Sequence, residues 1–281
     1  FTSYFDDLIL WRSGLITDES FGQRMGGIAN SVTNARGRRF FSPVEMSMQA
    51  PFVDAATAVD PNNRQNTFLS YYTWGSGIGL ALDLTLRTRF AGVTLDHLMR
   101  EMWRAHGVDE VTYQVDDVEA ALARITGDAA FARDFFDRYV RDSEAPDFPG
   151  LLAAAGVSVT TADPGAAWLG QLAVRFENGG AVMLGTPLLD SPFYEAGVDR
   201  GDRIVSIAGR AVGSGAAITA LLDARAPGDV VEIRYVSRGV EYTRSVALGA
   251  NPGLTGRWVA EGEASAEQRA FRAAWKSPTN D

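Results

Sequence analysis

The sequence has 281 residues, enough for two domains that each bury a core, and its hydrophobic content of 46% and charged content of 22% are ordinary for a globular protein. The formal net charge of -9 argues against a nucleic-acid binder, because a phosphate-binding surface needs clustered lysines and arginines, whereas the basic residues here are scattered. The lack of cysteine excludes disulfides and thiolate metal sites, and it leaves the redox compartment undecided between cytoplasm and periplasm.

Two helices are predicted over the first 35 residues. The apolar residues from Phe1 to Ile9 follow one helical face, and Gly14 ends that pattern. A second helix is predicted to begin at Thr17 and to run toward Ala35. Because residue 1 is not methionine and no capping residue precedes the first helix, we expect the chain to be a piece of a longer protein.

The middle of the first half holds the most apolar region. The segment before it is expected to be irregular because prolines interrupt it, at Pro43, Pro51 and Pro61. Residues 66–90 contain leucines at alternate positions, a pattern that would suit a strand. The length of this segment and its Leu and Ala content instead favour one long buried helix. The uninterrupted apolar stretch within this segment is too short to cross a bilayer. The next helix, from Thr94 to Gly107, carries an apolar stripe predicted to be core, made of Leu95, Leu98, Met99, Met102 and Trp103.

Short helices are predicted next, and the composition changes after Gly156. The helices span 116–125, 128–140 and 148–155. Beyond Gly156, β-branched runs and turn glycines predict a small β-rich domain with strands at 157–161, 171–176, 181–185, 202–207, 230–237 and 242–248. Helical patches are predicted at 191–196 and 216–224, and the tail from Asn251 is weakly patterned and expected to pack back on the body.

The segment 69–79 is the first candidate site, because Tyr71 and Tyr72 stand directly before glycines at alternate positions. Glycines let a backbone approach another group closely, and a phenol beside them could be presented to a substrate. The alternative is a helix start that packs against a neighbouring helix. The residues by themselves leave both interpretations open.

The second half resembles a bacterial PDZ domain. The motifs that carry the resemblance are, in order, Trp168-Leu169-Gly170-Gln171, the segments 191–198 and 200–209, and Ala226-Pro227-Gly228-Asp229. The resemblance implies that the loop from Trp168 to Leu172 offers backbone N–H groups to a peptide C-terminal carboxylate, and that the following strand accepts the peptide as an added strand. The helix at 216–224 would form the other wall of the groove. The alternative is that the groove serves only internal packing.

The whole chain resembles the glycyl aminopeptidase family of zinc metallopeptidases, which have a thermolysin-like catalytic domain and a C-terminal PDZ domain. The motifs are Phe1-Thr2-Ser3-Tyr4-Phe5-Asp6-Asp7-Leu8, Ser70-Tyr71-Tyr72-Thr73-Trp74-Gly75 and Leu95-Asp96-His97-Leu98-Met99-Arg100. In that family the first helix follows a Glu-Gly pair whose Glu is the third zinc ligand, after an upstream His-Glu-x-x-His helix. Neither motif is present in these 281 residues.

The same resemblance implies a role for Tyr72. It aligns with the tyrosine that related aminopeptidases place across the zinc from the general base, where its phenol would donate to the oxyanion of the tetrahedral intermediate. Tyr71 is the candidate if the register shifts by one. The family often has Lys where this chain has Trp74, so the resemblance implies no role for the Trp74 side chain.

No zinc site is predicted within the chain itself. The only histidines, His97 and His106, are nine residues apart and are expected to lie on helix surfaces. Ser76 lacks the context of a catalytic serine, and the glycines from Gly75 to Gly79 do not form a dinucleotide-binding motif. A serine-type PDZ protease is therefore disfavoured.

The sequence thus predicts an α + β multidomain chain, with the α-helical C-terminal half of a thermolysin-like catalytic domain at 1–156, a PDZ domain at 157–250 and a tail at 251–281. The predicted parent is a zinc aminopeptidase that removes N-terminal residues, with Gly or Ala as candidates, from peptide substrates. This chain, which has no zinc ligands, is expected to bind no zinc and to be inactive by itself. The alternative is a non-enzymatic module whose helical domain accompanies a peptide-binding PDZ domain.

Overall fold

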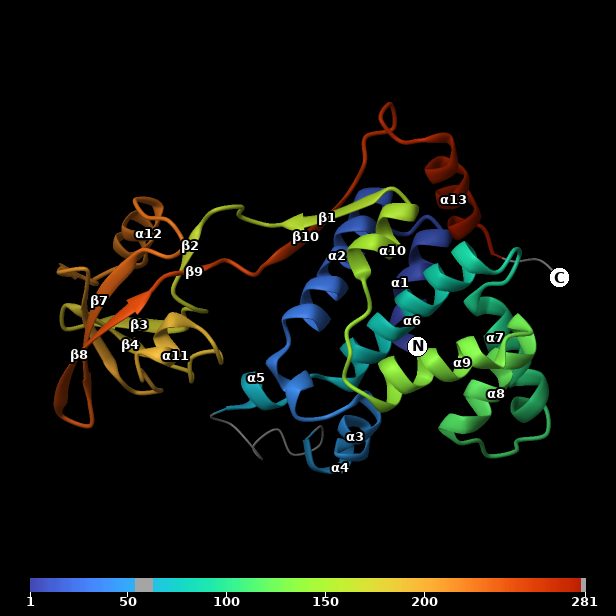
Figure 1. The fold of residues 1–281 in the computed structure, drawn as a ribbon, viewed down its shortest axis with the longest axis horizontal. Helices are drawn as coiled ribbons and strands as arrows, with labels where there is room; N and C mark the ends of the chain where they lie inside the picture. The colour runs from blue at the N-terminus through green and yellow to red at the C-terminus, as the bar shows by residue number, and fades with distance from the viewer. Residues whose placement is uncertain (54–62, 279–281) are drawn as a thin grey trace. The chain divides into compact units, whose positions relative to one another are not determined.

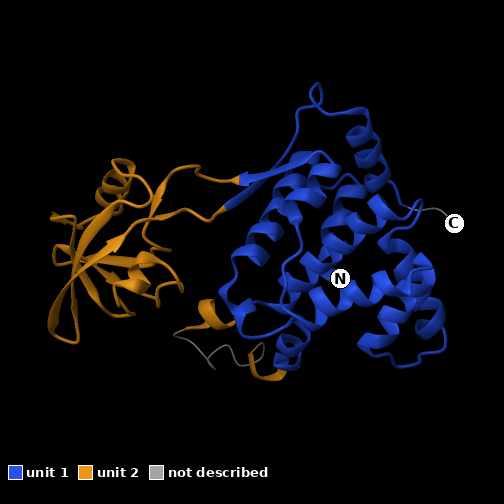
Figure 2. Cartoon of the chain, in the orientation of Figure 1, with its two compact units in different colours: residues 1–50, 69–160, 254–281 blue, residues 51–68, 161–253 orange. Residues whose placement is uncertain are grey.

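A computed structural model describes residues 1–53 and 63–278, and the chain divides into two compact units (Figures 1 and 2). Unit 1 comprises 1–50, 69–160 and 254–281, and it is built mainly from helices. Unit 2 comprises 51–68 and 161–253, and it contains the larger β-sheet. The α + β class is therefore confirmed. Among the described residues, no helix is both long enough and apolar enough to span a membrane.

The helices of unit 1 follow the sequence pattern closely. They are α1 (Thr2–Arg12), α2 (Asp18–Asn34), α3 (Pro43–Met48), α6 (Tyr71–Arg89), α7 (Leu95–Met102), α8 (Val115–Thr126), α9 (Ala129–Phe136), α10 (Phe148–Ala154) and α13 (Ala266–Lys276). The Thr17 side chain caps α2 by accepting from the Ser20 N–H group. The expectation of an irregular segment around Pro43 was wrong, since this proline is at the first position of α3 behind a Ser42 and Glu45 capping box. Pro61 lies outside the described residues.

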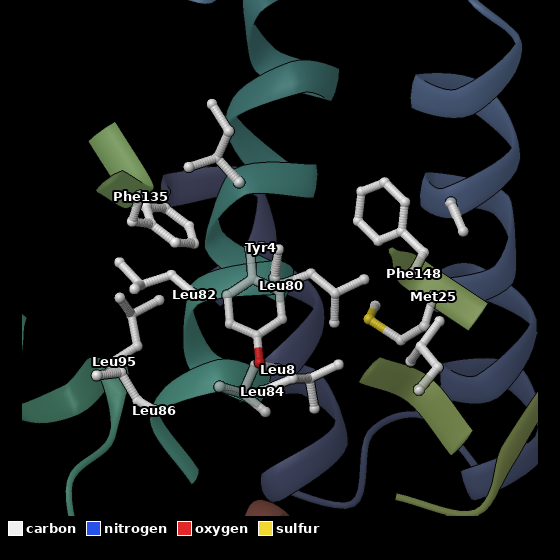
Figure 3. Packing of buried hydrophobic residues seen from close by; sticks show 14 of the residues in the cluster. Tyr4, Leu8, Met25, Leu80, Leu82, Leu84, Leu86, Leu95, Phe135 and Phe148 are labelled. Carbon is white, nitrogen blue, oxygen red and sulfur yellow. The ribbon is translucent and has the colours of Figure 1, made fainter. Parts of the chain in front are cut away.

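Helix α6 passes through the core of unit 1, and two of its glycines, Gly77 and Gly79, allow close packing on neighbouring helices. A Cβ on Gly79 would come within 3.1 Å of the Tyr4 Cβ on α1, and one on Gly77 would come within 2.8 Å of a Val32 methyl group on α2. The residues from Leu80 to Leu82 are fully buried, and Figure 3 shows the surrounding side chains. The structure therefore shows that 69–79 contains a helix start packed against its neighbours, and the catalytic role of Tyr71 or Tyr72 stays a prediction.

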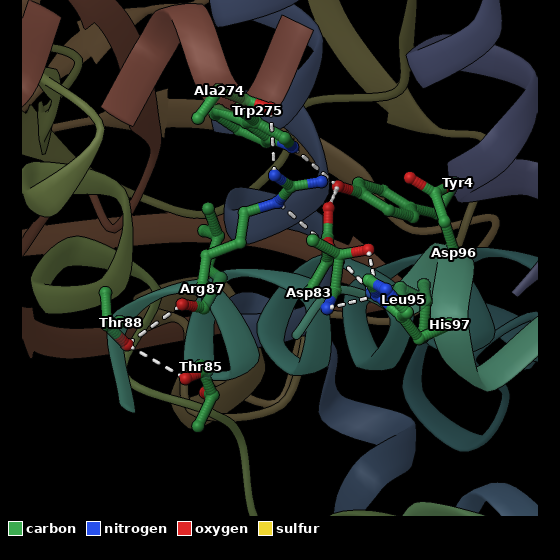
Figure 4. Close-up of polar contacts among 12 residues, drawn as sticks. Tyr4, Asp83, Thr85, Arg87, Thr88, Leu95, Asp96, His97, Ala274 and Trp275 are labelled. Atoms are coloured by element: carbon green, nitrogen blue, oxygen red, sulfur yellow. Dashed lines mark hydrogen bonds and ion pairs between the residues drawn. The ribbon is translucent and has the colours of Figure 1, made fainter. Parts of the chain in front are cut away.

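A buried polar network lies at the C-terminal end of α6 (Figure 4). The Asp83 carboxylate accepts hydrogen bonds from the Tyr4 hydroxyl at 2.6 Å, from the Arg87 Nε at 3.0 Å and from the Leu95 backbone N–H at 3.0 Å. The Trp275 indole N–H donates to the Tyr4 hydroxyl at 2.8 Å. Burial, aided by the Asp83 charge, raises the pKa of Tyr4 well above its usual value, so this phenol stays protonated and donates. The network joins four segments that are distant in the sequence.

The C-terminal segment forms regular structure that its weak sequence pattern did not predict. Strand β10 (Leu254–Trp258) pairs with β1 (Val157–Thr161), and α13 follows it. Trp275 of α13 is fully buried, with its ring edge-on to Phe21 at 5.0 Å. Gly26 of α2 and Gly256 of β10 allow a very close approach, since a Cβ on Gly26 would lie 2.2 Å from the Gly256 nitrogen.

Unit 2 contains an antiparallel sheet with the strand order β3-β4-β5-β7-β8. The elements are α5 (Arg64–Thr67), β2 (Ala167–Trp168), β3 (Val174–Glu177), β4 (Gly180–Met183), α11 (Pro192–Glu195), β5 (Arg203–Ile207), β6 (Arg210–Ala211), α12 (Gly215–Asp223), β7 (Val230–Ser237), β8 (Val240–Ala247) and β9 (Gly249–Ala250). The predicted strand at 157–161 exists, but as β1 it pairs with β10 in unit 1 rather than opening the β-rich unit. Its partner strand lies about a hundred residues away in the chain, so local pattern could not assign it.

Candidate functional site

The two candidate tyrosines occupy the first turn of α6. The Gly75 position lies beside the start of the chain, since a Cβ there would be 3.7 Å from the Phe1 nitrogen. The Tyr71 and Tyr72 rings are tilted against each other, with centroids 4.7 Å apart. The packing of α6 on α1 therefore places both phenols close to the chain segment that begins at Phe1.

The two tyrosines face different cavities. Tyr72 is 56% exposed and lines a space of about 350 Å3 together with Ser3 and the Asp7–Arg24 ion pair, whose N–O distance is 2.5 Å. No described residue forms a hydrogen bond with the Tyr72 hydroxyl. Tyr71 instead lines a mainly apolar cavity of about 510 Å3 that also contacts Phe1. Of the two, Tyr72 is the phenol with an accessible and unengaged hydroxyl.

A third cavity, of about 890 Å3, is also lined by Phe1, and sequence analysis did not find it. Met99 and Trp103, predicted to be core with the rest of their stripe, are 43% and 64% exposed. Leu95 and Leu98 are fully buried, as predicted. The predicted stripe is therefore fully buried only at its N-terminal end, and α7 is followed by a π-helical turn, Trp103–Gly107.

The histidines are not positioned as metal ligands. His97 belongs to the N-terminal cap of α7, where its Nδ1 lies 3.1 Å from the Thr94 backbone nitrogen. His106 lines the 890 Å3 cavity, with its ring 5.6 Å from that of Tyr113, and its buried Nδ1 has no hydrogen-bond partner among the described residues. Within 1–53 and 63–278, no three His, Asp or Glu side chains are grouped closely enough to hold a metal ion. The described residues therefore do not supply a zinc site.

The second candidate site is the loop 168–172 of unit 2. Trp168 pairs with Gly249 in the β2–β9 ladder, and the Leu169 side chain is fully buried in the unit 2 core. Gly170 has φ +123, and a Cβ there would lie 3.0 Å from Ser191. This backbone conformation and the close packing both require glycine. The side chains of Gln171 and Leu172 are exposed.

The backbone of this loop presents free donors. Within the described part of unit 2, the N–H groups of Gly170, Gln171 and Leu172 donate no hydrogen bond. Strand β3 follows at once and is an edge strand, hydrogen-bonded only to β4, so its other edge has no strand partner. Helix α12 contacts β2 beside the loop. Consecutive free N–H groups suit a carboxylate, and a free edge suits an added strand.

Gly170→Ala is expected to weaken the binding of peptide C-termini by about tenfold or more, because alanine is strained at this φ and its methyl group would displace the loop against Ser191. Titration with a library of peptides measures the effect. Gly213→Ala is the matched control, since Gly213 has no close neighbour and no positive φ. Amidated peptides should bind weakly to every variant, and equal binding of the amidated and free-acid forms would contradict the role of the loop.

The comparisons with known proteins agree with both resemblances. Residues 1–78 match a family model described as M61 glycyl aminopeptidase, and residues 187–236 match a model of the PDZ domain. No curated protein matches the sequence of the chain. The crystal structure of an aminopeptidase N family protein from Idiomarina loihiensis is similar to this chain with a TM-score of 0.78 and 25% identity. The match covers 99% of this chain and 47% of that protein, so the chain spans about half of its length.

Shorter similarities involve about a third of the chain. They include the HtrA-type protease AlgW with a decapeptide, at 21% identity, TM-score 0.27, and coverage of 30% of this chain and 29% of that one. The serine endoprotease from Yersinia pestis matches at 15% identity and a TM-score of 0.25, over 30% of this chain and 29% of that one. These scores are too low to support an argument about function. The match over residues 1–78, the PDZ match and the aminopeptidase fold together confirm that the chain resembles the glycyl aminopeptidase family with its C-terminal PDZ domain.

Proposed function

We propose that this chain is part of a zinc-dependent aminopeptidase, in which unit 1 contributes one wall of the active site and unit 2 is a PDZ domain. The observation that carries the proposal is the exposed and unengaged Tyr72 hydroxyl, held at the start of α6 beside the chain segment that matches the aminopeptidase family. The expected reaction is the hydrolysis of the first peptide bond of a substrate with a free N-terminus. Glycine and alanine are the N-terminal residues that the family resemblance favours.

The role proposed for Tyr72 follows from the chemistry of acyl transfer. Attack on a peptide carbonyl places negative charge on its oxygen, and a donor already aimed at that oxygen lowers the barrier. The phenol of Tyr72 is a suitable donor because nothing in the described chain competes for its proton. Buried glycines lock α6 against α1 and α2, so the hydroxyl is carried by a rigid helix rather than by a loop.

Zinc is part of the proposal only for the complete protein. The described residues contain no group of three His, Asp or Glu side chains that could hold the metal. The family resemblance locates its ligands in an upstream Glu-Gly pair and a His-Glu-x-x-His helix.

An assay of the complete protein tests the proposal. The expected result is release of the N-terminal residue from short peptides and from amino-acid amides, with loss of activity when the N-terminus is acetylated. Chelation of the metal should abolish turnover, and added Zn²⁺ should restore it. Hydrolysis of N-acetylated peptides at the same rate, or no hydrolysis at all, would contradict an aminopeptidase.

A second candidate function is peptide binding by unit 2 without catalysis. It is favoured by the free N–H groups of the 170–172 loop and by the unpaired edge of β3. In this case the partner is a peptide C-terminus rather than an N-terminus. The two functions are separable, because the Gly170 substitution should leave the hydrolysis of short amides unchanged.

A further inference from the structure

The loop 168–172 of unit 2 is joined to the N-terminal end of α11 by a hydrogen bond and by close packing. The Leu169 carbonyl accepts from the Phe193 N–H at 3.1 Å, and both side chains are fully buried in the unit 2 core. Ser191, which caps α11, is also fully buried, and a Cβ on Gly170 would lie 3.0 Å from it. A peptide carboxylate held by the N–H groups of this loop therefore acts on backbone that is packed directly on the start of α11.

The segment that precedes α11 is held by a residue from the first half of the chain. The Ser191 N–H donates to the Leu188 carbonyl at 3.0 Å. The Asn66 side-chain amide on α5 donates to the Pro187 carbonyl at 2.9 Å and accepts from the Leu189 N–H at 2.9 Å. Asn66 is fully buried, so a broken bond here would leave a polar group without a partner and without water. A shift of this segment is therefore expected to move Asn66 with it.

Only a short piece of chain separates Asn66 from the candidate tyrosines. Phe68 has φ -124 and ψ 133, which is an extended conformation, and Leu69 is buried in the core of unit 1. The chain from Asn66 to Leu69 can span at most about 11 Å, so it has little slack. A displacement of Asn66 is therefore passed on to Leu69 and to the start of α6, which follows at Tyr71.

The first turn of α6, which carries Tyr71 and Tyr72, has no cap of its own. Ser70 is the N-cap residue, but its side chain forms no capping hydrogen bond, and the turn contains no acidic residue. Uncapped helix starts fray, because their first N–H groups have no partner within the helix. The closest packing of α6 on its neighbours begins at Gly77, beyond this turn. The order of the first turn therefore depends on how firmly the preceding residues are held.

We infer that a peptide C-terminus bound at the 168–172 loop raises the activity of the proposed active site, with Asn66 as the positioning residue that transmits the change to Tyr72. The inference rests on the proposed aminopeptidase function and specifies its regulation. A bound carboxylate orders the loop, since ligand-binding loops are among the least stable parts of a protein. The ordered loop holds Ser191 and Asn66 in place, and the Tyr72 hydroxyl then spends more time in the position of an oxyanion donor.

Steady-state kinetics of the complete protein, with and without a bound peptide, tests the inference. The substrate is L-alaninamide, which has no C-terminal carboxylate. The added peptide is the tightest binder of the C-terminal library, N-acetylated so that it is not itself a substrate. At saturation it should raise kcat at least about fivefold and change KM little, whereas its C-terminal amide should have no effect. Gly170→Ala should need about tenfold more peptide for the same increase.

Hydrogen exchange of the complete protein gives a second readout that does not depend on activity. The same acetylated peptide should slow the exchange of the backbone amides of residues 69–74 by about fivefold or more, because the first turn of α6 frays less. The amides of α13, which is distant in sequence from this turn, should exchange at the same rate with and without the peptide.

The variants test the path through Asn66. Asn66→Ala should still bind the peptide, with neither the increase in kcat nor the slower exchange at 69–74. Gln65→Ala is the matched control, since Gln65 is exposed in the same turn, and it should respond as the wild type does. Ser191→Ala removes the hydroxyl that lies against Gly170, should reduce the response, and gives an independent result if Asn66→Ala does not fold.

The outcomes separate this inference from the proposed function. A peptide that binds without changing kcat or the exchange of 69–74 would overturn the inference, as would a library with no binder or an Asn66→Ala variant that responds fully. Hydrolysis that ignores the bound peptide would thus leave the aminopeptidase intact. Slower exchange at 69–74 without hydrolysis of any substrate would support the connection to α6 and refute the enzyme.

Discussion

Replacing Asp83 by alanine is expected to lower the free energy of unfolding of unit 1 by about 3–5 kcal/mol. The carboxylate is fully buried, and its removal would leave the Arg87 guanidinium, the Tyr4 hydroxyl and the Leu95 N–H group without the acceptor they share. An unpaired buried cation is the most costly of these, because the low-polarity interior cannot replace its solvation. Urea unfolding followed by tryptophan fluorescence measures the change, since Trp168 is the one tryptophan of unit 2.

Asp6→Ala on α1 is the control for this prediction, because Asp6 is exposed and such a surface change should alter stability by less than about 0.5 kcal/mol. Asp83→Asn should destabilise less than Asp83→Ala, because the amide oxygen still accepts from Arg87 and Leu95. Equal stability of Asp83→Ala and the wild type would show that the network does not hold the helices together.

Tyr72→Phe in the complete protein is expected to lower kcat by about 10² to 10³-fold, the usual cost of removing one oxyanion donor. Metal content and KM should change little, because the ring is retained and no described residue depends on the hydroxyl. Stability should also be unchanged, since the side chain is more than half exposed. Steady-state kinetics with an amino-acid amide, together with metal analysis, measures these quantities.

Tyr71→Phe and Tyr113→Phe are the comparison variants. Tyr71 is the neighbouring candidate, and a loss of kcat in Tyr71→Phe with normal Tyr72→Phe would shift the catalytic assignment by one residue. Tyr113 is exposed to a similar extent in the third cavity and should retain kcat. Normal turnover of both Tyr71→Phe and Tyr72→Phe would remove this turn of α6 from the mechanism.

The exposure of Trp103 in the 890 Å3 cavity could not be predicted from the sequence. The apolar stripe of 95–103 has the spacing of a core helix, and that spacing correctly identifies Leu95 and Leu98 as buried. It cannot show that Trp103 remains exposed, because exposure depends on what the rest of the fold brings over that turn. The only local signal was Gly107, four residues after Trp103, whose role as the support of the ring emerges only when the π-helical turn is known.

Helix α6 likewise has some features that the sequence predicts and others that only the tertiary structure shows. Its length, leucine content and C-terminal arginines were enough to predict α6 against the strand alternative. Its glycines had two interpretations, and only the positions of α1 and α2 decided that they serve helix packing. The importance of Asp83 was not predicted, because its partners are known only when the fold brings Tyr4 and Leu95 to it, and Trp275 to the Tyr4 hydroxyl.

The sequence by itself determined the helical first half, the β-rich second half and the family motifs, because helix caps, hydrophobic periodicity and turn glycines act within a few residues of one another. Only the tertiary structure decided which strand pairs with β1, that the C-terminal Trp275 completes the core of unit 1, and that Trp103 and Glu110 line one cavity. These features depend on contacts between residues far apart in the chain, and the free energy that selects them comes from burial and hydrogen bonding in the assembled fold.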